Sequence, residues 1–148
     1  MKSKLILRGH GYFERRRKDG SKIDSWECSN LIVTMGKVEV AKLLNNVDSP
    51  AYFRAIAIGE GVVDPAIGQE ALGSEVARES ADLSYEATGK AIFEKTFNFG
   101  TAESYSITEA GVFNNASSGG DMLDRFKFSA KDVDVDTDLY AKITITVA

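Results

Sequence analysis

Cysteine, histidine, tryptophan and proline are scarce in this sequence, which has one cysteine, one histidine, one tryptophan and two prolines among 148 residues. The single cysteine, Cys28, excludes an internal disulfide and a cysteine-based metal cage, so packing alone must hold the fold. Assembly in a reducing cytosol is the simplest expectation. The lone His10 is not part of a motif that pairs it with a second catalytic residue. We therefore predict that it is a surface residue rather than a general base.

Long apolar runs are also absent from the sequence. Near its basic start the apolar stretch covers only residues 5–7, which is far short of a signal-peptide core or a membrane span. We therefore expect no membrane association and no secretion by that route.

The residues that are plentiful favour β-structure. Hydrophobic residues make up 43% of the chain, enough for one core, so we expect one compact domain. Thirteen glycines, eight phenylalanines and five tyrosines suit a turn-rich protein whose strands are joined by aromatic pairs. The predicted fold class is mainly β: an antiparallel β-sandwich or jelly roll with one short helix and an N-terminal β-hairpin arm. Further strands are predicted at residues 4–8, 30–33, 52–59, 91–99, 104–114, 122–129 and 139–147.

One helix is predicted, over residues 35–46. Apolar residues recur there at three-residue steps, from Met35 to Val47, and would form a face that covers the core. Thr34 can cap the start of this helix and Asn46 can end it.

Glycines divide the segment after residue 59. We expect residues 60–81 to form a long ordered loop that leads into an extended segment. Gly59, Gly61 and Gly68 lack the spacing of a phosphate-binding loop, and no phosphate-binding lysine follows them. We predict that these glycines serve turns with positive φ.

Charge is divided unevenly along the chain. Residues 1–22 hold eight lysines or arginines against two acidic residues, whereas the remainder holds ten against twenty. The pattern predicts a β-hairpin with strands at 12–17 and 22–28 and a turn at 18–21.

This pattern divides the chain into a basic arm over residues 1–29 and a β-sandwich over residues 30–148, within one compact domain overall. A basic hairpin beside an acidic body favours docking on an acidic neighbour, such as another copy of the chain. Nucleic acid is the weaker alternative, in which phosphates would bind the same side chains. The candidate partner-binding residues are Arg15, Arg16, Arg17 and Lys18.

The aspartates at residues 132–138 alternate like the opening of a calcium loop. Thr137, however, stands where that loop needs glycine, and Ile143 stands where it needs a bidentate glutamate. The pattern is typical of a half-solvated approach to a strand, with the carboxylates on one face. Calcium is the alternative at this position, and we predict no metal site.

Glu109 is an acidic residue that we expect to be partly buried, because it lies between apolar residues near the centre of a predicted strand. A buried carboxylate needs a partner, and Arg54 or Arg78 has the right chemistry. We interpret Glu109 as a structural brace. A catalytic role would need a second acid or a nucleophile nearby, which the sequence does not single out.

The order of several motifs resembles a group of small structural proteins of tailed bacteriophages. In that group a strand ending NL(I/V)V leads to a glycine and a helix, and an I.E.G(L/V)F strand precedes an L..R..F strand. The matching segments here, between residues 30 and 147, are NLIVTMGKVEVAKLL, FRAIAIGEG, ALGSEVAR, IFEKTFNF, ITEAGVFN and MLDRFKFS.

The resemblance implies a virion protein that is assembled in the host cytoplasm. Proteins of this kind decorate or cement the capsid, commonly as a homotrimer, with the major capsid protein as partner. Attachment to the tail fibre, collar or neck is the alternative, with tail or neck proteins as partners. An enzyme would need paired acids in a cleft, so we predict no catalytic residues and no bound cofactor.

Overall fold

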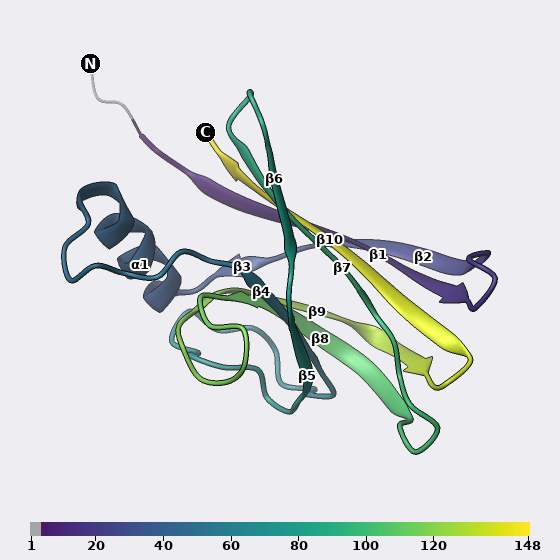
Figure 1. The fold of residues 1–148 in the computed structure, drawn as a ribbon. Helices are drawn as coiled ribbons and strands as arrows, with labels where there is room; N and C mark the ends of the chain where they lie inside the picture. The colour runs from purple at the N-terminus through teal and green to yellow at the C-terminus, as the bar shows by residue number, and fades with distance from the viewer. Residues whose placement is uncertain (1–3) are drawn as a thin grey trace.

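The computed structural model describes residues 4–148 and confirms the predicted fold class, an antiparallel β-sandwich with one short helix. Sheet A has the strand order β2-β1-β10-β7-β6, and sheet B has the order β3-β9-β8-β4-β5. Figure 1 shows the two sheets, with α1 at one end of the molecule. The elements are β1 (Leu7–Arg17), β2 (Lys22–Ser29), β3 (Leu31–Ile32), α1 (Thr34–Asn45), β4 (Ala55–Gly59), β5 (Glu75–Ser80), β6 (Asp82–Glu86), β7 (Lys90–Phe97), β8 (Tyr105–Phe113), β9 (Met122–Val133) and β10 (Thr137–Val147).

The predicted hairpin is present, but it is part of sheet A rather than a separate arm. β1 pairs with β2 on one side. On its other side β1 pairs with β10 along its whole length, from Leu7 opposite Val147 to Arg17 opposite Thr137. The strands predicted separately near the N-terminus are therefore one continuous strand, and the sandwich begins with β1.

Alternating residues of the two inner sheet faces form the main core. On β10 every second residue from Leu139 to Ile145 is buried, and Phe13 of β1 is fully buried between the sheets. β4 and most of β8 are buried on both faces, because residues 60–74 fold over the outer face of sheet B. A second, smaller apolar cluster lies there and contains Val33, Ala57, Leu72, Phe113 and Met122.

α1 lies against β9 through a residue without a side chain. A Cβ at Gly36 would overlap the backbone of Leu123, so glycine is what permits this close approach. The predicted end of the helix at Asn46 is confirmed, since Asn46 has a left-handed φ of 56°. The predicted cap at Thr34 is wrong, because the helix already includes Thr34 and the preceding Val33 provides no side-chain cap.

The apolar face predicted to cover the core is exposed instead. Leu44 is 76% exposed and Val38 is 47% exposed, whereas the buried residues of α1 are Gly36 and Glu39. The contact with Leu123 explains the difference, because approach through Gly36 turns most of the apolar stripe away from β9. The helix therefore closes only part of this end of the sandwich.

The chain passes from sheet B to sheet A through a very short connection. β5 ends at Ser80 and β6 begins at Asp82, so the single residue Ala81 makes the step. The N–H of Ala81 donates to the carbonyl of Arg54 (2.8 Å). The extended segment predicted before residue 81 is β5. β6 was not predicted, and every one of its residues is exposed.

Asn30 links the two sheets through its side chain. Its Oδ1 accepts a hydrogen bond from the N–H of Gly9 in β1 (2.9 Å), and its Nδ2 donates to the carboxylate of Asp124 in β9. Asp124 is fully buried and also accepts from the N–H of Val112 (3.0 Å). Burial raises the pKa of Asp124 to about 7, although both hydrogen bonds favour its charged form.

Candidate interaction site

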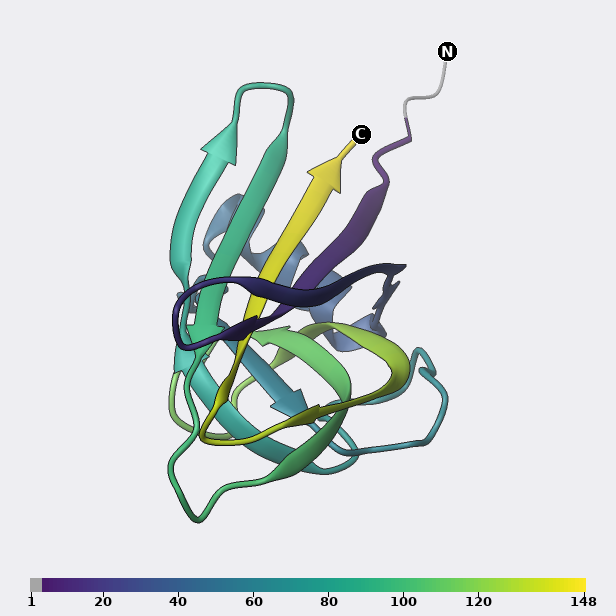
Figure 2. The same ribbon diagram turned by 90° about the vertical axis from the view of Figure 1, so that its right-hand side faces the viewer.

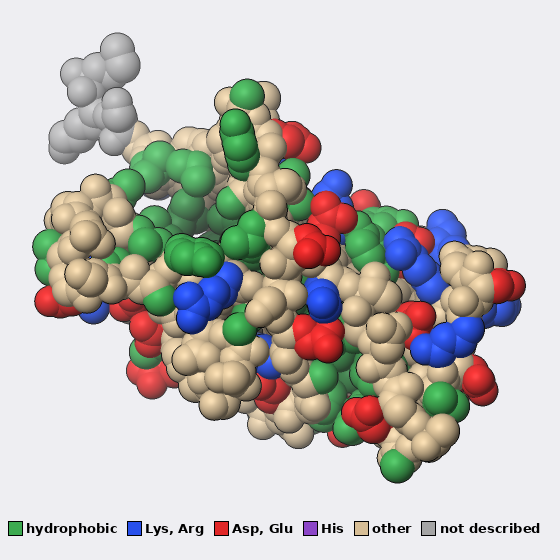
Figure 3. Space-filling model, viewed as in Figure 1, with side chains coloured by type: hydrophobic (Ala, Val, Ile, Leu, Met, Phe, Trp, Pro, Cys, Tyr) green, Lys and Arg blue, Asp and Glu red, His purple; other side chains and the backbone are tan. Residues whose placement is uncertain are grey.

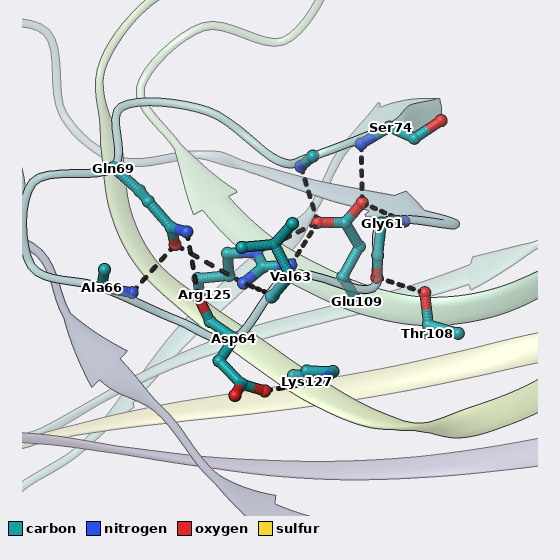
Figure 4. A network of polar contacts seen from close by, with 11 residues as sticks. Gly61, Val63, Asp64, Ala66, Gln69, Ser74, Thr108, Glu109, Arg125 and Lys127 are labelled. Atoms are coloured by element: carbon teal, nitrogen blue, oxygen red, sulfur yellow. Dashed lines mark hydrogen bonds and ion pairs between the residues drawn. The ribbon is translucent and has the colours of Figure 1, made fainter.

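Glu109 of β8 is fully buried in a polar network beneath residues 60–74 (Figure 4). The N–H groups of Gly61 (2.5 Å), Gly73 (2.8 Å) and Ser74 (2.8 Å) donate to its carboxylate. The Nε of Arg125 in β9 also donates to it, at 3.0 Å. Glu109 therefore fastens both ends of this loop to sheet B.

The partner of Glu109 is Arg125, not Arg54 or Arg78. The side chains of the pair are 0% and 1% exposed, and Arg125 also donates to the carbonyl of Val63 in the loop (2.6 Å). The guanidinium groups of Arg54 and Arg78 lie over aromatic rings instead. Sequence reasoning missed Arg125, although its place in the predicted strand at residues 122–129, next to Phe126, was a signal for a buried cation.

Glu109 is held in its ionised form. Burial raises its pKa, but the hydrogen bonds from the three backbone N–H groups and from Arg125 outweigh burial, so the pKa lies below the ordinary value of 4.5. A carboxylate has about four lone-pair sites, and these donors occupy them. The arrangement holds a loop in place and leaves no free acceptor for proton transfer.

Gly59 and Gly61 allow the backbone to approach this network closely. A Cβ at Gly61 would overlap the carboxylate of Glu109, and a Cβ at Gly59 would overlap the carbonyl of Ser74. Neither of these glycines nor Gly68 has a positive φ. The prediction of positive-φ turns at these positions is therefore wrong, because what the structure requires at Gly59 and Gly61 is the missing side chain.

The basic run at the tip of the β1–β2 hairpin has acidic partners inside the protein. Three of its four residues pair with carboxylates, and Arg17 lies 3.5 Å from both the Ser21 hydroxyl and the Lys22 carbonyl. The pairs are Arg15–Asp24 (2.7 Å), Arg16–Glu14 (3.1 Å) and Lys18–Asp138. Because these partners offset most of its charge, the run attracts an acidic neighbour less than its sequence alone indicates.

The aspartates at residues 132–138 run from the end of β9, through the turn, to the start of β10 and make separate contacts. Asp138 pairs with Lys18, for example. Within residues 4–148 no group of three or more His, Cys, Asp or Glu side chains is placed to hold a metal ion. His10 lies on the surface of sheet A, 3.5 Å from Glu27.

A groove with apolar walls lies between α1 and the segment that leads into β1. Its volume is about 400 Å³. Figure 3 shows a hollow surrounded by hydrophobic side chains on this part of the surface. We call it the open-end groove, and its lining residues are Lys4, Leu5, Ile6, Leu7, Lys37, Val40, Ala41 and Leu44.

The open-end groove combines exposed apolar surface with positive charge. Leu5 is 62% exposed and Leu44 is 76% exposed. Lys4 and Lys37 are the charged lining residues, and neither forms an ion pair with another residue in the described range. Apolar side chains that gather in a surface groove are typical of a site that another molecule covers.

No protein-family model, curated protein or solved structure matches this chain. Across residues 4–148, no helix is long and apolar enough to cross a membrane. The open-end groove is therefore the candidate functional site on its geometry and chemistry alone.

Proposed function

We propose that this protein is a structural component of a tailed-phage particle, a capsid decoration protein that binds the outer shell and stabilises it. The observation that carries the proposal is the apolar surface of the open-end groove. Apolar side chains that gather in a surface groove are typical of a binding site, so we infer that an assembly partner covers this one. The motifs that resemble phage structural proteins support this class of assembly.

Residues 60–74 provide a second surface for contact. Val62 is 70% exposed and Ile67 is 60% exposed, although Glu109 fixes both ends of the loop. A loop that is already ordered loses little conformational entropy on binding. One protomer could thus contact two neighbouring subunits with preformed surfaces.

The proposed homotrimer would add avidity to these contacts. When three copies are linked, the second and third contacts form at a high effective concentration. A trimer that binds the assembled shell but not free subunits also stabilises the shell by mass action. Modest contacts on each protomer are therefore sufficient for cementing.

Co-sedimentation of the labelled protein with separated heads and tails of the parent phage tests this function. Binding to heads in proportion to the major capsid protein, with greater resistance of those heads to heating, is the expected result. Binding confined to tails or necks would overturn the head location in favour of the adaptor role. Absence of binding to either fraction would overturn the virion role.

A further inference from the structure

We propose that the outer face of sheet A binds an uncharged oligosaccharide. In this sheet β10 lies between β1 and β7 (Figure 2). A pocket of about 440 Å³, which we call the outer-face pocket, is lined by side chains of β1, β2 and β10. Its volume is in the range of about 300–1,000 Å³ that is typical of small-molecule sites. The inference does not depend on the proposed virion role, because it concerns the purified protein alone.

The strand register places the lining side chains of the outer-face pocket together, on the side of sheet A that faces away from the core. Phe13 is fully buried in the core, so its neighbours in β1, Tyr12 and Glu14, point to the opposite face. Tyr12 lies opposite Lys142 of β10, and Glu14 lies opposite Tyr140. Two adjacent strands therefore present aromatic and charged side chains side by side on one face.

The two tyrosines of the outer-face pocket are held in place by their neighbours. The ring centroids of Tyr12 and Tyr140 lie 6.4 Å apart in an edge-to-face arrangement. The guanidinium of Arg16 lies 4.1 Å from the centroid of the Tyr140 ring. The hydroxyl of Tyr140 donates to Glu94 of β7 (2.7 Å). Because side chains that are already ordered lose little conformational entropy on binding, the pocket is preformed for a ligand.

The charged side chains that line the outer-face pocket balance one another. With His10 neutral, the lining contains two cations, Arg16 and Lys142, and two carboxylates, Glu14 and Glu27. Arg16 donates to Glu14 (3.1 Å), whereas Lys142 forms no ion pair with another described residue. A ligand with a net charge would meet attraction and repulsion together. The pocket therefore favours an uncharged ligand that offers both donors and acceptors.

A sugar has the groups that this lining requires. Each sugar hydroxyl can donate to a carboxylate and accept from Lys142 or Arg16. The C–H groups of a sugar ring can pack on tyrosine, whose apolar ring ends in a polar hydroxyl. A purely apolar ligand would instead leave the charged groups without partners. A phosphate-bearing ligand would be repelled by Glu14 and Glu27.

Binding of the labelled full chain to an array of immobilised oligosaccharides, both uncharged and acidic, tests the proposal. We expect binding to uncharged members, and calorimetric titration with the tightest binder then gives the Kd. Tyr12→Val removes one ring but keeps a residue that favours strands, and it should weaken binding about 10-fold. Lys142→Thr removes a charged donor and should also weaken binding about 10-fold.

Tyr85→Val is the matched control for the loss of a tyrosine. Tyr85 is 82% exposed on β6 of the same sheet and does not line the outer-face pocket, so this variant should bind like the wild type. Circular dichroism checks that each variant folds, and Lys142→Thr decides the outcome if Tyr12→Val does not fold. Wild-type affinity in either folded variant would overturn the proposal. So would an equal loss of affinity in the control, or an array on which no uncharged oligosaccharide binds.

Discussion

The carboxylate of Glu109 and the N–H of Gly61 lie 2.5 Å apart, although 48 residues separate them along the chain. The contact joins β8 to the first residues of the loop that follows β4. It depends on the absence of a Cβ at Gly61. A buried charge thereby fixes the backbone of a surface loop, and Val62 is held where it can meet another molecule.

Glu109→Gln keeps the shape of the side chain but removes the charge that Arg125 faces. We expect a loss of about 3–5 kcal/mol in the free energy of unfolding, because breaking a buried ion pair leaves an uncompensated charge. Urea unfolding measures this loss. As a control, Glu79→Gln removes an exposed pair with Lys95 (3.9 Å) and should cost about 1 kcal/mol or less. Equal losses for the two variants would contradict the bracing role.

Asp124 should make the folded protein less stable as the pH rises. Its pKa is about 7 in the folded state against an ordinary value of 3.8. Between these values the folded protein binds more protons than the unfolded chain, so the stabilisation is lost as the pH rises through the folded pKa. Thermal unfolding at about pH 5 and about pH 8, on either side of that pKa, measures the difference.

Asp124→Asn should remove most of this pH dependence. It should also lower stability at every pH, because an amide nitrogen cannot accept the hydrogen bond from Asn30. The control is Asp134→Asn, in an exposed turn, which should keep the wild-type difference. If the wild type became more stable over this pH interval and Asp124→Asn abolished the gain, the assigned direction would be wrong.

Gly36→Ala should destabilise the protein although alanine favours helices over glycine by about 1 kcal/mol. The new Cβ would overlap the backbone of Leu123, and overpacking costs about 1–3 kcal/mol. Gly68→Ala is the matched control, because a Cβ there meets nothing within 4 Å. Chemical denaturation should show a loss for the first variant and none for the second. Unchanged stability of Gly36→Ala would argue against the close helix contact.

Leu44→Glu should separate particle binding from folding. Leu44 is 76% exposed, so the free energy of unfolding should change by less than about 0.5 kcal/mol. Binding to phage heads should fall, because the charge enters the open-end groove. Asn45→Glu adds the same charge one residue later on α1, outside the groove lining, and should bind normally in the same sedimentation assay. Wild-type binding by Leu44→Glu would remove the groove from the proposed function.

The strands that alternate between core and solvent could be predicted from sequence. β10 was predicted at residues 139–147 and is observed at Thr137–Val147, because its period of two reports directly which face is buried. β6 has every residue exposed and therefore carries no such signal. The helix could be located as well. The spacing of its apolar residues does not say whether their face meets the core, because the close contact at Gly36 sets the orientation of the helix.

The partner of Glu109 could not be predicted, because it depends on register. Glu109 lies opposite Lys127, and Arg125 is two residues earlier in β9, opposite Gly111. A bulge between Ile107 and Glu109 sets this alignment, and local sequence does not specify it. The residue type of the partner was predictable and its position was not.

The pairing of β1 with β10 also determines how the protein responds to mechanical force. Ile6 and Ala148 exchange two backbone hydrogen bonds (2.6 and 2.9 Å) beside the pair of Leu7 and Val147. Tension applied through these two ends would act along the inter-strand hydrogen bonds, which lie perpendicular to antiparallel strands. The bonds would then break one pair after another, as a zipper opens, instead of sharing the load in shear. The segment that lines the open-end groove lies where this unzipping begins, so a molecule bound in the groove would reinforce the mechanically weakest part of the sandwich.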